Sequence, residues 1–122
     1  MAKKILIIDD EPDVAKVVVY RLKAKGYEVF IAASGKEGID LAETQKPDLI
    51  LLDYRLPDML ASQVAEEIRR REYLKHIPFI LITASSEDIA EKAKVCLTAD
   101  YISKPIESDE LYAKVEKYLA II

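Results

Sequence analysis

The chain has 122 residues, of which 51% are hydrophobic and 33% are charged, and its formal net charge is −4. This length predicts one domain over residues 1–122, and the apolar content is too high for a disordered segment. No apolar run is long enough to cross a bilayer, and the first one ends at Asp9, too early for a secretion signal, so we expect a cytoplasmic protein with no membrane contact. The acidic excess argues against direct binding of nucleic acid. The single cysteine, Cys96, cannot form an internal disulfide and is expected to be a buried free thiol.

Five short apolar runs alternate with segments in which apolar residues recur at helical spacing. This alternation is typical of repeated strand–helix units, which build a parallel sheet covered by helices on both faces. The predicted strands are Lys4–Ile8, Tyr27–Ala32, Leu49–Leu52, Phe79–Ile82 and Tyr101–Ser103.

Each predicted strand is followed by a predicted helix. The first helix begins near Pro12 and ends at Gly26. The second begins with a capping box that Ser34 opens, whereas the third has no clear N-terminal cap. Ser85 and Ser108 are expected to cap the fourth and fifth helices. The residues expected to face the core are Val14, Val17, Val18, Leu22, Ile39, Ala42, Val64, Ala65, Ile68, Ile89, Ala93, Leu111, Tyr112, Val115, Tyr118 and Leu119.

Two conspicuous features are interpreted as ordinary surface. Glu66 stands four positions before Arg70, and Glu67 stands four positions before Arg71. This spacing predicts that the basic run Arg69–Arg71 belongs to a salt-bridged helix face rather than to a nucleic-acid patch. His76 is the only histidine and precedes a strand, at the end of the sheet opposite the expected site. It is therefore expected at the surface, which leaves no candidate for a histidine triad or a histidine metal site.

Ligands of open parallel sheets bind beyond the carboxyl ends of the strands, so the residues there are the candidates for a functional site. These residues are Asp9, Asp10 and Glu11 after the first strand, Asp53 after the third, Thr83 after the fourth and Lys104 after the fifth. Right-handed crossovers and a flavodoxin-like strand order would make the first and third strands neighbours. Asp9, Asp10 and Asp53 would then face one another.

Three carboxylates at such short range repel, and a hard divalent cation is the natural means of neutralising them. A small acidic site that keeps several waters suits Mg²⁺ or Mn²⁺ better than Ca²⁺. An aspartate in such a site can attack phosphorus and form an acyl phosphate, while the cation and a lysine neutralise the phosphoryl oxygens. Taken singly, each residue has a simpler explanation: Asp10 or Glu11 could cap a helix, and Thr83 and Lys104 could be ordinary strand-end residues. The joint pattern is what favours a phosphoryl-transfer site.

Four motifs occur at these strand ends, and together they resemble the receiver domain of two-component response regulators over the whole chain. The motifs are Ile7-Ile8-Asp9-Asp10-Glu11-Pro12, Leu51-Leu52-Asp53-Tyr54-Arg55-Leu56-Pro57-Asp58-Met59, Leu81-Ile82-Thr83-Ala84 and Asp100-Tyr101-Ile102-Ser103-Lys104-Pro105. The resemblance implies an α/β, doubly wound, flavodoxin-like fold with five parallel strands in the order 2-1-3-4-5 and five helices on both faces.

The resemblance also implies the chemistry of the site. Asp53 would accept a phosphoryl group from a phosphohistidine of a partner histidine kinase or histidine phosphotransfer protein. Asp10, Asp53 and the Arg55 carbonyl would hold Mg²⁺, with Mn²⁺ as a substitute, and Asp9 would reach the cation through water. The domain would be a phosphoacceptor that catalyses its own phosphorylation and dephosphorylation, and not an enzyme with separate substrates.

Other residues acquire roles in the same way. Thr83 and Lys104 would bind the phosphoryl oxygens, and Tyr101 would be an aromatic switch that turns inward when Thr83 moves. Arg55 and Ser85, each two positions after a site residue, would tune the lifetime of the phosphoryl group. The surface from Ser86 to Ile122 would change on phosphorylation and contact a downstream protein or effector domain, and two-fold dimerisation through it is a further expectation.

Several positions depart from the family pattern. Leu60-Ala61 stands where an acidic or amide residue and a glycine are common, which puts the start of the third helix in question. Leu97-Thr98 replaces a common Gly-Ala, and Ile106 replaces a common aromatic residue. Lys104-Pro105 keeps the pattern, and the resemblance implies a cis peptide bond there.

Three other functions are alternatives to a receiver domain. Phosphohydrolases with an aspartate nucleophile commonly carry a second aspartate two residues later, where this chain has Arg55. A flavin or nucleotide binder would need a phosphate-binding loop rich in Gly, Ser or Thr after the first strand, and three acidic residues stand there instead. A binding module that is never phosphorylated remains an alternative, although nothing in the sequence favours it.

Overall fold

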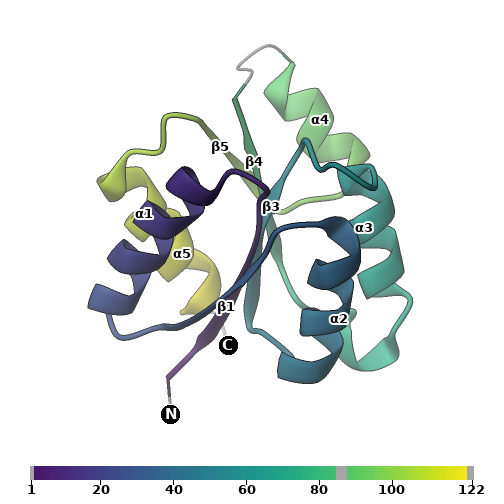
Figure 1. Ribbon diagram of the computed structural model, residues 1–122, viewed down its shortest axis with the longest axis horizontal. Coiled ribbons are helices and arrows are strands. Elements are labelled where there is room, and N and C mark those ends of the chain that lie inside the picture. The colour runs from purple at the N-terminus through teal and green to yellow at the C-terminus, as the bar shows by residue number, and fades with distance from the viewer. Residues whose placement is uncertain (1, 85–87, 121–122) are drawn as a thin grey trace.

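The computed structural model describes residues 2–84 and 88–120 and contains one sheet of five parallel strands (Figure 1). The strands are β1 Lys4–Ile8, β2 Glu28–Ala32, β3 Leu49–Asp53, β4 Phe79–Thr83 and β5 Asp100–Ser103. They lie in the order β2-β1-β3-β4-β5, and every neighbouring pair is parallel. The predicted flavodoxin-like order is therefore confirmed, and no strand end differs from its predicted position by more than one residue.

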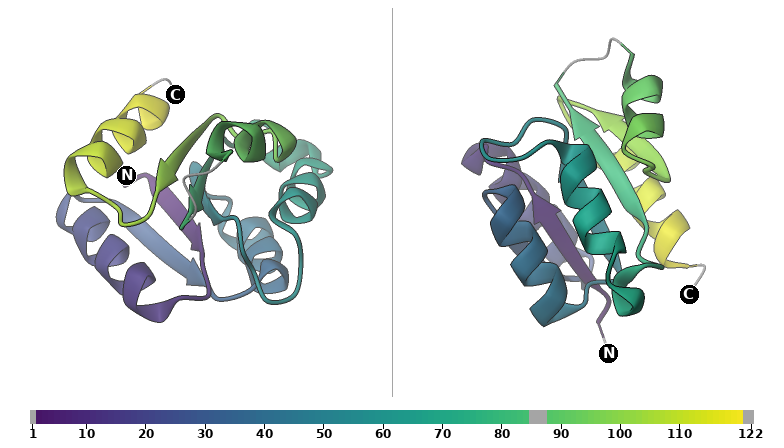
Figure 2. Two further views of the ribbon diagram at one scale, coloured as in Figure 1. Left: turned by 90° about the horizontal axis from the view of Figure 1, so that it is seen from above. Right: turned by 90° about the vertical axis from the view of Figure 1, so that its right-hand side faces the viewer.

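Helices cover both faces of this sheet (Figure 2). They are α1 Pro12–Ala24, α2 Gly35–Gln45, α3 Ala61–Arg69, α4 Ile89–Val95 and α5 Ser108–Leu119. Helices α1 and α5 pack on one face, and α2, α3 and α4 pack on the other. A short 3₁₀ helix, Glu72–Leu74, lies between α3 and β4 and was not predicted. None of the helices in the described part of the chain combines the length and the apolar character that a membrane span requires.

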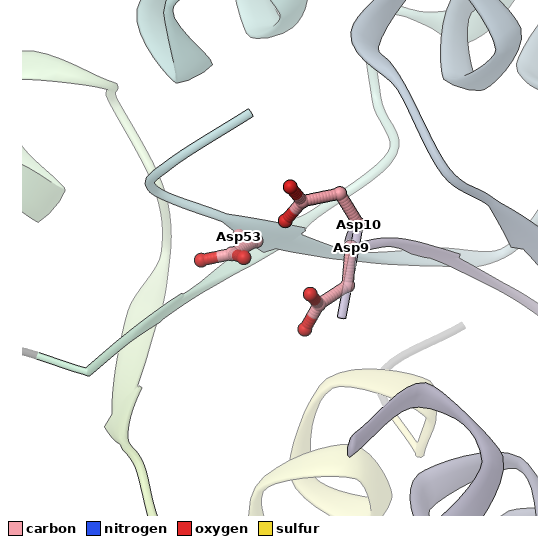
Figure 3. Close-up of side chains that lie close together, drawn as sticks. All are labelled: Asp9, Asp10 and Asp53. Atoms are coloured by element: carbon pink, nitrogen blue, oxygen red, sulfur yellow. The ribbon is translucent and has the colours of Figure 1, made fainter. Parts of the chain in front are cut away.

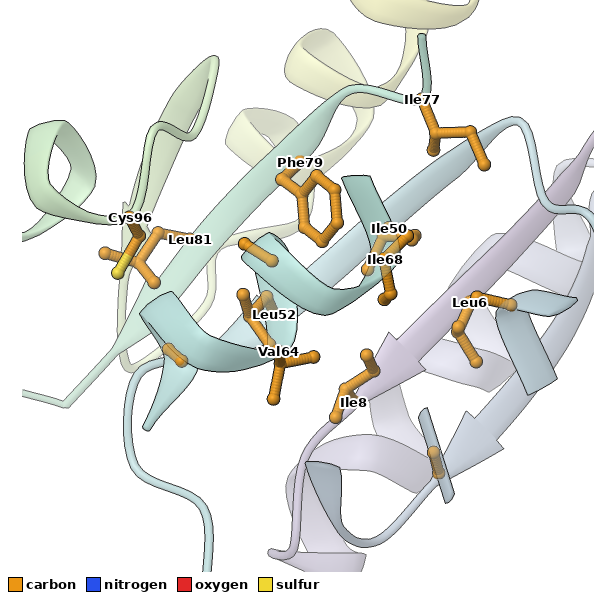
Figure 4. Close-up of a cluster of buried hydrophobic side chains, with 14 of the residues drawn as sticks. Leu6, Ile8, Ile50, Leu52, Val64, Ile68, Ile77, Phe79, Leu81 and Cys96 are labelled. Atoms are coloured by element: carbon orange, nitrogen blue, oxygen red, sulfur yellow. The ribbon is translucent and has the colours of Figure 1, made fainter. Parts of the chain in front are cut away.

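The two central strands β3 and β4 are buried along their whole length. Each face of the sheet forms its own hydrophobic cluster with its helices, and Figure 4 shows the one under α3, in which Phe79 and Ile68 take part. A glycine allows the close approach of α2 to β1, because a Cβ atom on Gly38 would lie 2.5 Å from Cδ1 of Ile8. Helix packing covers both faces of the sheet, whereas the carboxyl ends of the strands stay open to ligands.

The helix ends agree in part with the sequence-based expectations. Gly26 follows α1 with a φ of 92°, as expected of a terminating glycine, and the Ser34 hydroxyl accepts a hydrogen bond of 3.2 Å from the Glu37 amide. The prediction that Ser108 caps the last helix is wrong. The chain enters α5 one residue earlier, since the Leu111 amide already donates to the Glu107 carbonyl, and Ser108 is the first helical residue. Ser85, the other predicted cap, lies outside the described residues.

One residue of the predicted core is misplaced. Val17 is 47% exposed, whereas Ala15, Val18 and Leu22 are the buried residues of α1. These three lie at positions i, i+3 and i+7 of one helix face, and Val17 lies beside that face. A run of consecutive valines does not by itself reveal which of them points inward.

The loop between β3 and α3 is anchored to the start of α2. The Asp58 carboxylate accepts hydrogen bonds from the Gly35 and Lys36 amides at 2.8 and 3.0 Å, and these two bonds lower its pKa. They satisfy two of the amides that a helix N-terminus leaves free. Ala61, where a glycine is common in the family, is the first helical residue of α3, and the Leu60 amide donates to the Gln63 side chain at 3.0 Å, so α3 begins without that glycine.

The end of α4 carries a second departure from the pattern. Leu97 has a φ of 56°, in the left-handed region that glycine adopts most easily. The Thr98 amide donates to the Ala93 carbonyl at 2.9 Å, which closes the helix end. The Arg69 guanidinium also donates to the Cys96 carbonyl at 3.0 Å and to the Leu97 carbonyl, so α3 supports the end of α4.

The surface interpretations are confirmed. Arg70 pairs with Glu66 at 2.8 Å, the Arg71 guanidinium lies 3.8 Å from a carboxylate oxygen of Glu67, and His76 is exposed. The Cys96 thiol is buried, and this burial raises its pKa.

Candidate phosphoryl-transfer site

The predicted site residues lie at the carboxyl ends of the strands. Asp53 is the last residue of β3, and Asp9 directly follows β1, where its amide donates to the Ala32 carbonyl of β2 at 2.9 Å. Because β1 and β3 are neighbours, the loop after β1 and the end of β3 meet at one edge of the sheet.

Three carboxylates come together there, as Figure 3 shows. Asp9, Asp10 and Asp53 each offer an oxygen within 4.8 Å of the others. Asp9 and Asp53 are 4% and 3% exposed, whereas Asp10 is open to solvent. The site thus has a buried floor made by two carboxylates and an accessible side made by the third.

Lys104 reaches this cluster from the end of β5. Its ammonium nitrogen lies 3.2 Å from Asp9 Oδ2, 3.3 Å from Asp53 Oδ2 and 2.8 Å from Glu11 Oε1. The lysine side chain is only 9% exposed, so these contacts are held largely away from water. The Lys104-Pro105 peptide bond is cis, as the resemblance to receiver domains implies.

The charges perturb one another strongly. Burial, together with the neighbouring charge of Asp9, raises the pKa of Asp53 to about 7, although the Lys104 ammonium works in the opposite direction. Burial alone would lower the pKa of Lys104, but the hydrogen bond to Glu11 and the charges of Asp53 and Asp9 outweigh it and raise that pKa. The site therefore resists the ionisation of Asp53 and keeps Lys104 charged.

The donor set fits a hard divalent cation. It consists of carboxylate oxygens from three residues, and a bound cation would offset the burial and the Asp9 charge that raise the pKa of Asp53. A cleft of about 290 Å³ opens beside these groups and is lined by Asp10, Asp53, Arg55 and Ala84 among others. This space gives a ligand access to Asp53 from solvent.

The remaining predicted residues lie on β4, on β5 and in the loop after β3. Thr83 ends β4 and is 1% exposed, and its carbonyl accepts a hydrogen bond of 2.8 Å from the Lys104 amide. The Arg55 amide donates to Asp53 Oδ1 at 3.3 Å. Tyr101 lies on β5 and is 36% exposed, with the Lys114 ammonium 5.2 Å from the centre of its ring. Ser85, predicted to tune the phosphoryl lifetime, lies outside the described residues, as do residues 86, 87, 121 and 122 of the predicted output surface.

Two residues of this region were not given their structural roles from the sequence. The sequence predicts Glu11 only as an acidic strand-end residue or a helix cap, yet it makes the shortest contact to Lys104. The sequence predicts no separate role for Asp58, yet it anchors the loop that follows Asp53. The acidic run at positions 9–11 was a usable signal for Glu11, whereas nothing local indicates the partners of Asp58, which lie 22 and 23 residues away.

Comparison with known families decides what this arrangement is. Residues 5–116 match the family model of the response regulator receiver domain. The chain belongs to this family. As a receiver domain it is part of the two-component signalling systems, which confirms the resemblance seen in the motifs.

Solved structures agree with this assignment. A response regulator from Chloroflexus aurantiacus is 31% identical, with a TM-score of 0.91 over 98% of this chain and 99% of that one. The receiver domain of a sensor histidine kinase from Pseudomonas aeruginosa is 30% identical, with a TM-score of 0.87 over 98% and 99% of the two chains, and holds a magnesium ion in its active-site cleft. A CheY-like receiver domain protein from Methanospirillum hungatei is 29% identical, with a TM-score of 0.88 over 99% and 96%.

Proposed function

We propose that this receiver domain takes a phosphoryl group onto Asp53 from a phosphohistidine of a histidine kinase or a histidine phosphotransfer protein, in a reaction that depends on Mg²⁺. The observation that carries the proposal is the contact of a buried Lys104 ammonium with Asp53 and Asp9 inside an acidic cluster. A nucleophilic carboxylate, a fixed positive charge and a set of metal-ligand oxygens thus stand within reach of one phosphoryl group.

The chain's own groups account for the transfer. A carboxylate oxygen of Asp53 attacks phosphorus, the bond from phosphorus to the histidine nitrogen breaks, and the imidazole of the donor leaves with the electron pair and takes up a proton. Lys104 is already held beside Asp53 Oδ2 and neutralises charge on the phosphoryl oxygens. The Thr83 hydroxyl, at the end of the neighbouring strand, donates to one of those oxygens.

Asp10 and Asp53 would hold Mg²⁺ together with the Arg55 carbonyl, and Asp9 would contact it through water. When bound, the cation supplies positive charge that favours ionised Asp53 and neutralises the phosphoryl oxygens. Water later attacks phosphorus, the bond from phosphorus to the Asp53 oxygen breaks, and inorganic phosphate and the free carboxylate are formed, so the domain dephosphorylates itself. Arg55, on the rim of the cleft, stands where it can control access of that water, in keeping with a role in tuning the lifetime together with Ser85.

Phosphorylation is proposed to act through Thr83 and Tyr101. Movement of the Thr83 hydroxyl toward the phosphoryl group vacates space beside β5, and the half-exposed ring of Tyr101 turns into it. The surface from Ser86 to Ile122 then changes and contacts a downstream protein or effector domain, or a second copy of the chain.

Phosphorylation by a small donor tests the proposal. Phosphoramidate carries the same phosphorus–nitrogen bond as phosphohistidine, and incubation with it and Mg²⁺ should add the mass of one phosphoryl group to the intact protein. Asp53→Asn should not gain this mass, whereas Asp109→Asn, an exposed carboxylate on α5, should behave as the wild type. If the wild type gains no mass, a binding module that is never phosphorylated is favoured. If the protein instead hydrolyses the phosphoramidate continuously, a phosphohydrolase is favoured.

A further inference from the structure

A continuous groove runs between α3 and α4, and at one end it shares Arg55 and Leu56 with the phosphoryl-transfer cleft. It consists of two hollows of about 480 and 430 Å³, and both are lined by Ser62, Val95 and Cys96. The first hollow continues to Leu60 and the loop after β3, and the second continues to Leu97 at the end of α4. The two hollows therefore form one groove along the paired helices.

Three large apolar side chains of this groove are open to water. Leu60, Val95 and Leu97 are 65%, 70% and 71% exposed. Single exposed apolar residues are common on protein surfaces, but a group of them along one groove is typical of an interaction site.

Two of the three also stand where a leucine is locally unfavourable. Leu60 is the N-cap residue of α3, a position that favours Ser, Thr, Asp or Asn, and its side chain makes no capping hydrogen bond. Leu97 has a φ of 56°, which glycine adopts without strain and leucine does not. Because both side chains are mostly exposed, they recover little of this cost by packing within the domain. Residues that destabilise a fold locally, and whose cost is not offset by packing within the domain, point to a function.

The charges around the groove indicate its partner. The lining contains Arg55, Arg69 and Arg70 against one acid, Glu66. Glu66 pairs with Arg70 at 2.8 Å, so Arg55 and Arg69 carry the excess positive charge of the groove, although the whole chain has a net charge of −4. The Arg69 guanidinium is bonded to the Cys96 and Leu97 carbonyls, so these contacts leave its positive charge available to a ligand. Two copies of the chain placed face to face through this groove would bring like charges together, which argues against a symmetric dimer here.

We propose that the groove between α3 and α4 binds an amphipathic helix of another protein that carries acidic residues beside its apolar stripe. A helix fits a groove between two helices because its apolar residues recur at i, i+3, i+4 and i+7 and can occupy successive hollows. Acidic flanks meet the arginines, and the apolar stripe covers Leu60, Val95 and Leu97. Val95, Cys96 and Leu97 of this site lie within the surface proposed to respond to phosphorylation, but its occupation does not require Asp53 chemistry.

A displayed library of helical peptides with a fixed apolar stripe and random flanking residues tests the proposal. The library is selected on the unphosphorylated domain, and the enriched peptides are then measured by fluorescence anisotropy against the wild type, Leu97→Gly and Val95→Asp. We expect enrichment of Glu and Asp in the flanks and at least about a tenfold loss of affinity in both variants. Tyr20→Asp is the matched control, since Tyr20 is 77% exposed on α1, on the other face of the sheet, and should leave affinity unchanged.

Thermal melting separates a binding role of Leu97 from a structural one. Leu97→Gly should melt at the same or a higher temperature than the wild type, because glycine relieves the left-handed backbone, while its affinity for the peptides falls. A large fall in melting temperature would make Leu97 a structural residue and overturn the argument. The proposal also fails if enriched peptides have basic or neutral flanks, if they bind all variants equally, if no peptide is enriched, or if sedimentation shows a dimer that Val95→Asp dissociates.

Discussion

Replacing Asp53 by asparagine should stabilise the metal-free domain at neutral pH. The pKa of Asp53 is about 7 in the folded protein, against 3.8 as its ordinary value, because burial and the charge of Asp9 disfavour its ionised form. The folded state thus holds a proton that the unfolded chain has released between these two pH values. Stability from this group is complete below about pH 4 and is lost as the pH rises to about 7.

The magnitude follows from the same two values. A difference of about three pKa units corresponds to about 4 kcal/mol once both states have released the proton. The amide in Asp53→Asn gives up the ion pair with Lys104, which offsets part of the gain. We therefore expect the variant to be more stable than the wild type by about 1–3 kcal/mol near pH 7.5, and by much less near pH 4.5.

Urea unfolding of both proteins in buffer with a chelator provides the measurement, with the transition midpoint converted to a free energy of unfolding. Asp40→Asn on the exposed side of α2 is the matched control and should show a small difference that does not grow with pH. If the advantage of Asp53→Asn were the same at both pH values, or if the variant were less stable near pH 7.5, the account of a strained ionised Asp53 would be wrong.

Three further predictions concern the metal, the loop and the switch. Mg²⁺ should raise the melting temperature of the wild type, because it binds the folded acidic cluster and not the unfolded chain, and an equal rise in Asp10→Ala would place the cation elsewhere. Asp58→Ala should lower the free energy of unfolding by about 1 kcal/mol near pH 7, since two helix amides lose their acceptor. That loss should vanish as the pH falls below the ordinary pKa of aspartate, because the Asp58 carboxyl, whose pKa is lowered in the fold, contributes stability only while it is ionised. A loss of the same size at every pH in urea unfolding would contradict this reading. In a complex with Mg²⁺ and beryllofluoride, a mimic of the phosphoryl group, NMR should show the Tyr101 ring turned inward. Lys104→Arg should bind Mg²⁺ but fail to turn Tyr101. An unchanged Tyr101 ring in the wild-type complex would refute the switch.

The sequence predicted those parts of the fold that depend on local pattern. The buried strands β3 and β4 are continuous apolar runs, and Ser34 and Gly26 mark helix ends through chemistry that acts within a few residues. The site residues could be found because parallel strands bring their carboxyl ends to one edge, so that Asp9, Asp53 and Lys104 meet without being near in sequence.

Other features depend on contacts that no local pattern encodes. Asp58 completes the start of a helix 22 residues earlier in the chain, and Glu11 finds Lys104 across 93 positions. The apolar pattern of α1 predicts Val17 in the core together with three other apolar residues at helical spacing. Only the packing of α1 against the sheet shows that Val17 is the exposed one. Leu97 stands where a glycine is common, which indicates a left-handed backbone, but only the structure shows that Leu97 adopts this conformation.

Chemical trapping of the phosphorylated residue tests the central claim most directly. An aspartyl phosphate is reduced by borohydride to homoserine, a change that peptide mass spectrometry can assign to one position. After incubation with phosphoramidate and Mg²⁺, our account predicts that homoserine appears at position 53 and at no other aspartate, and that it is absent when Mg²⁺ is chelated. Homoserine at Asp9 or Asp10, or a protein that gains phosphate without any reducible aspartate, would contradict the account.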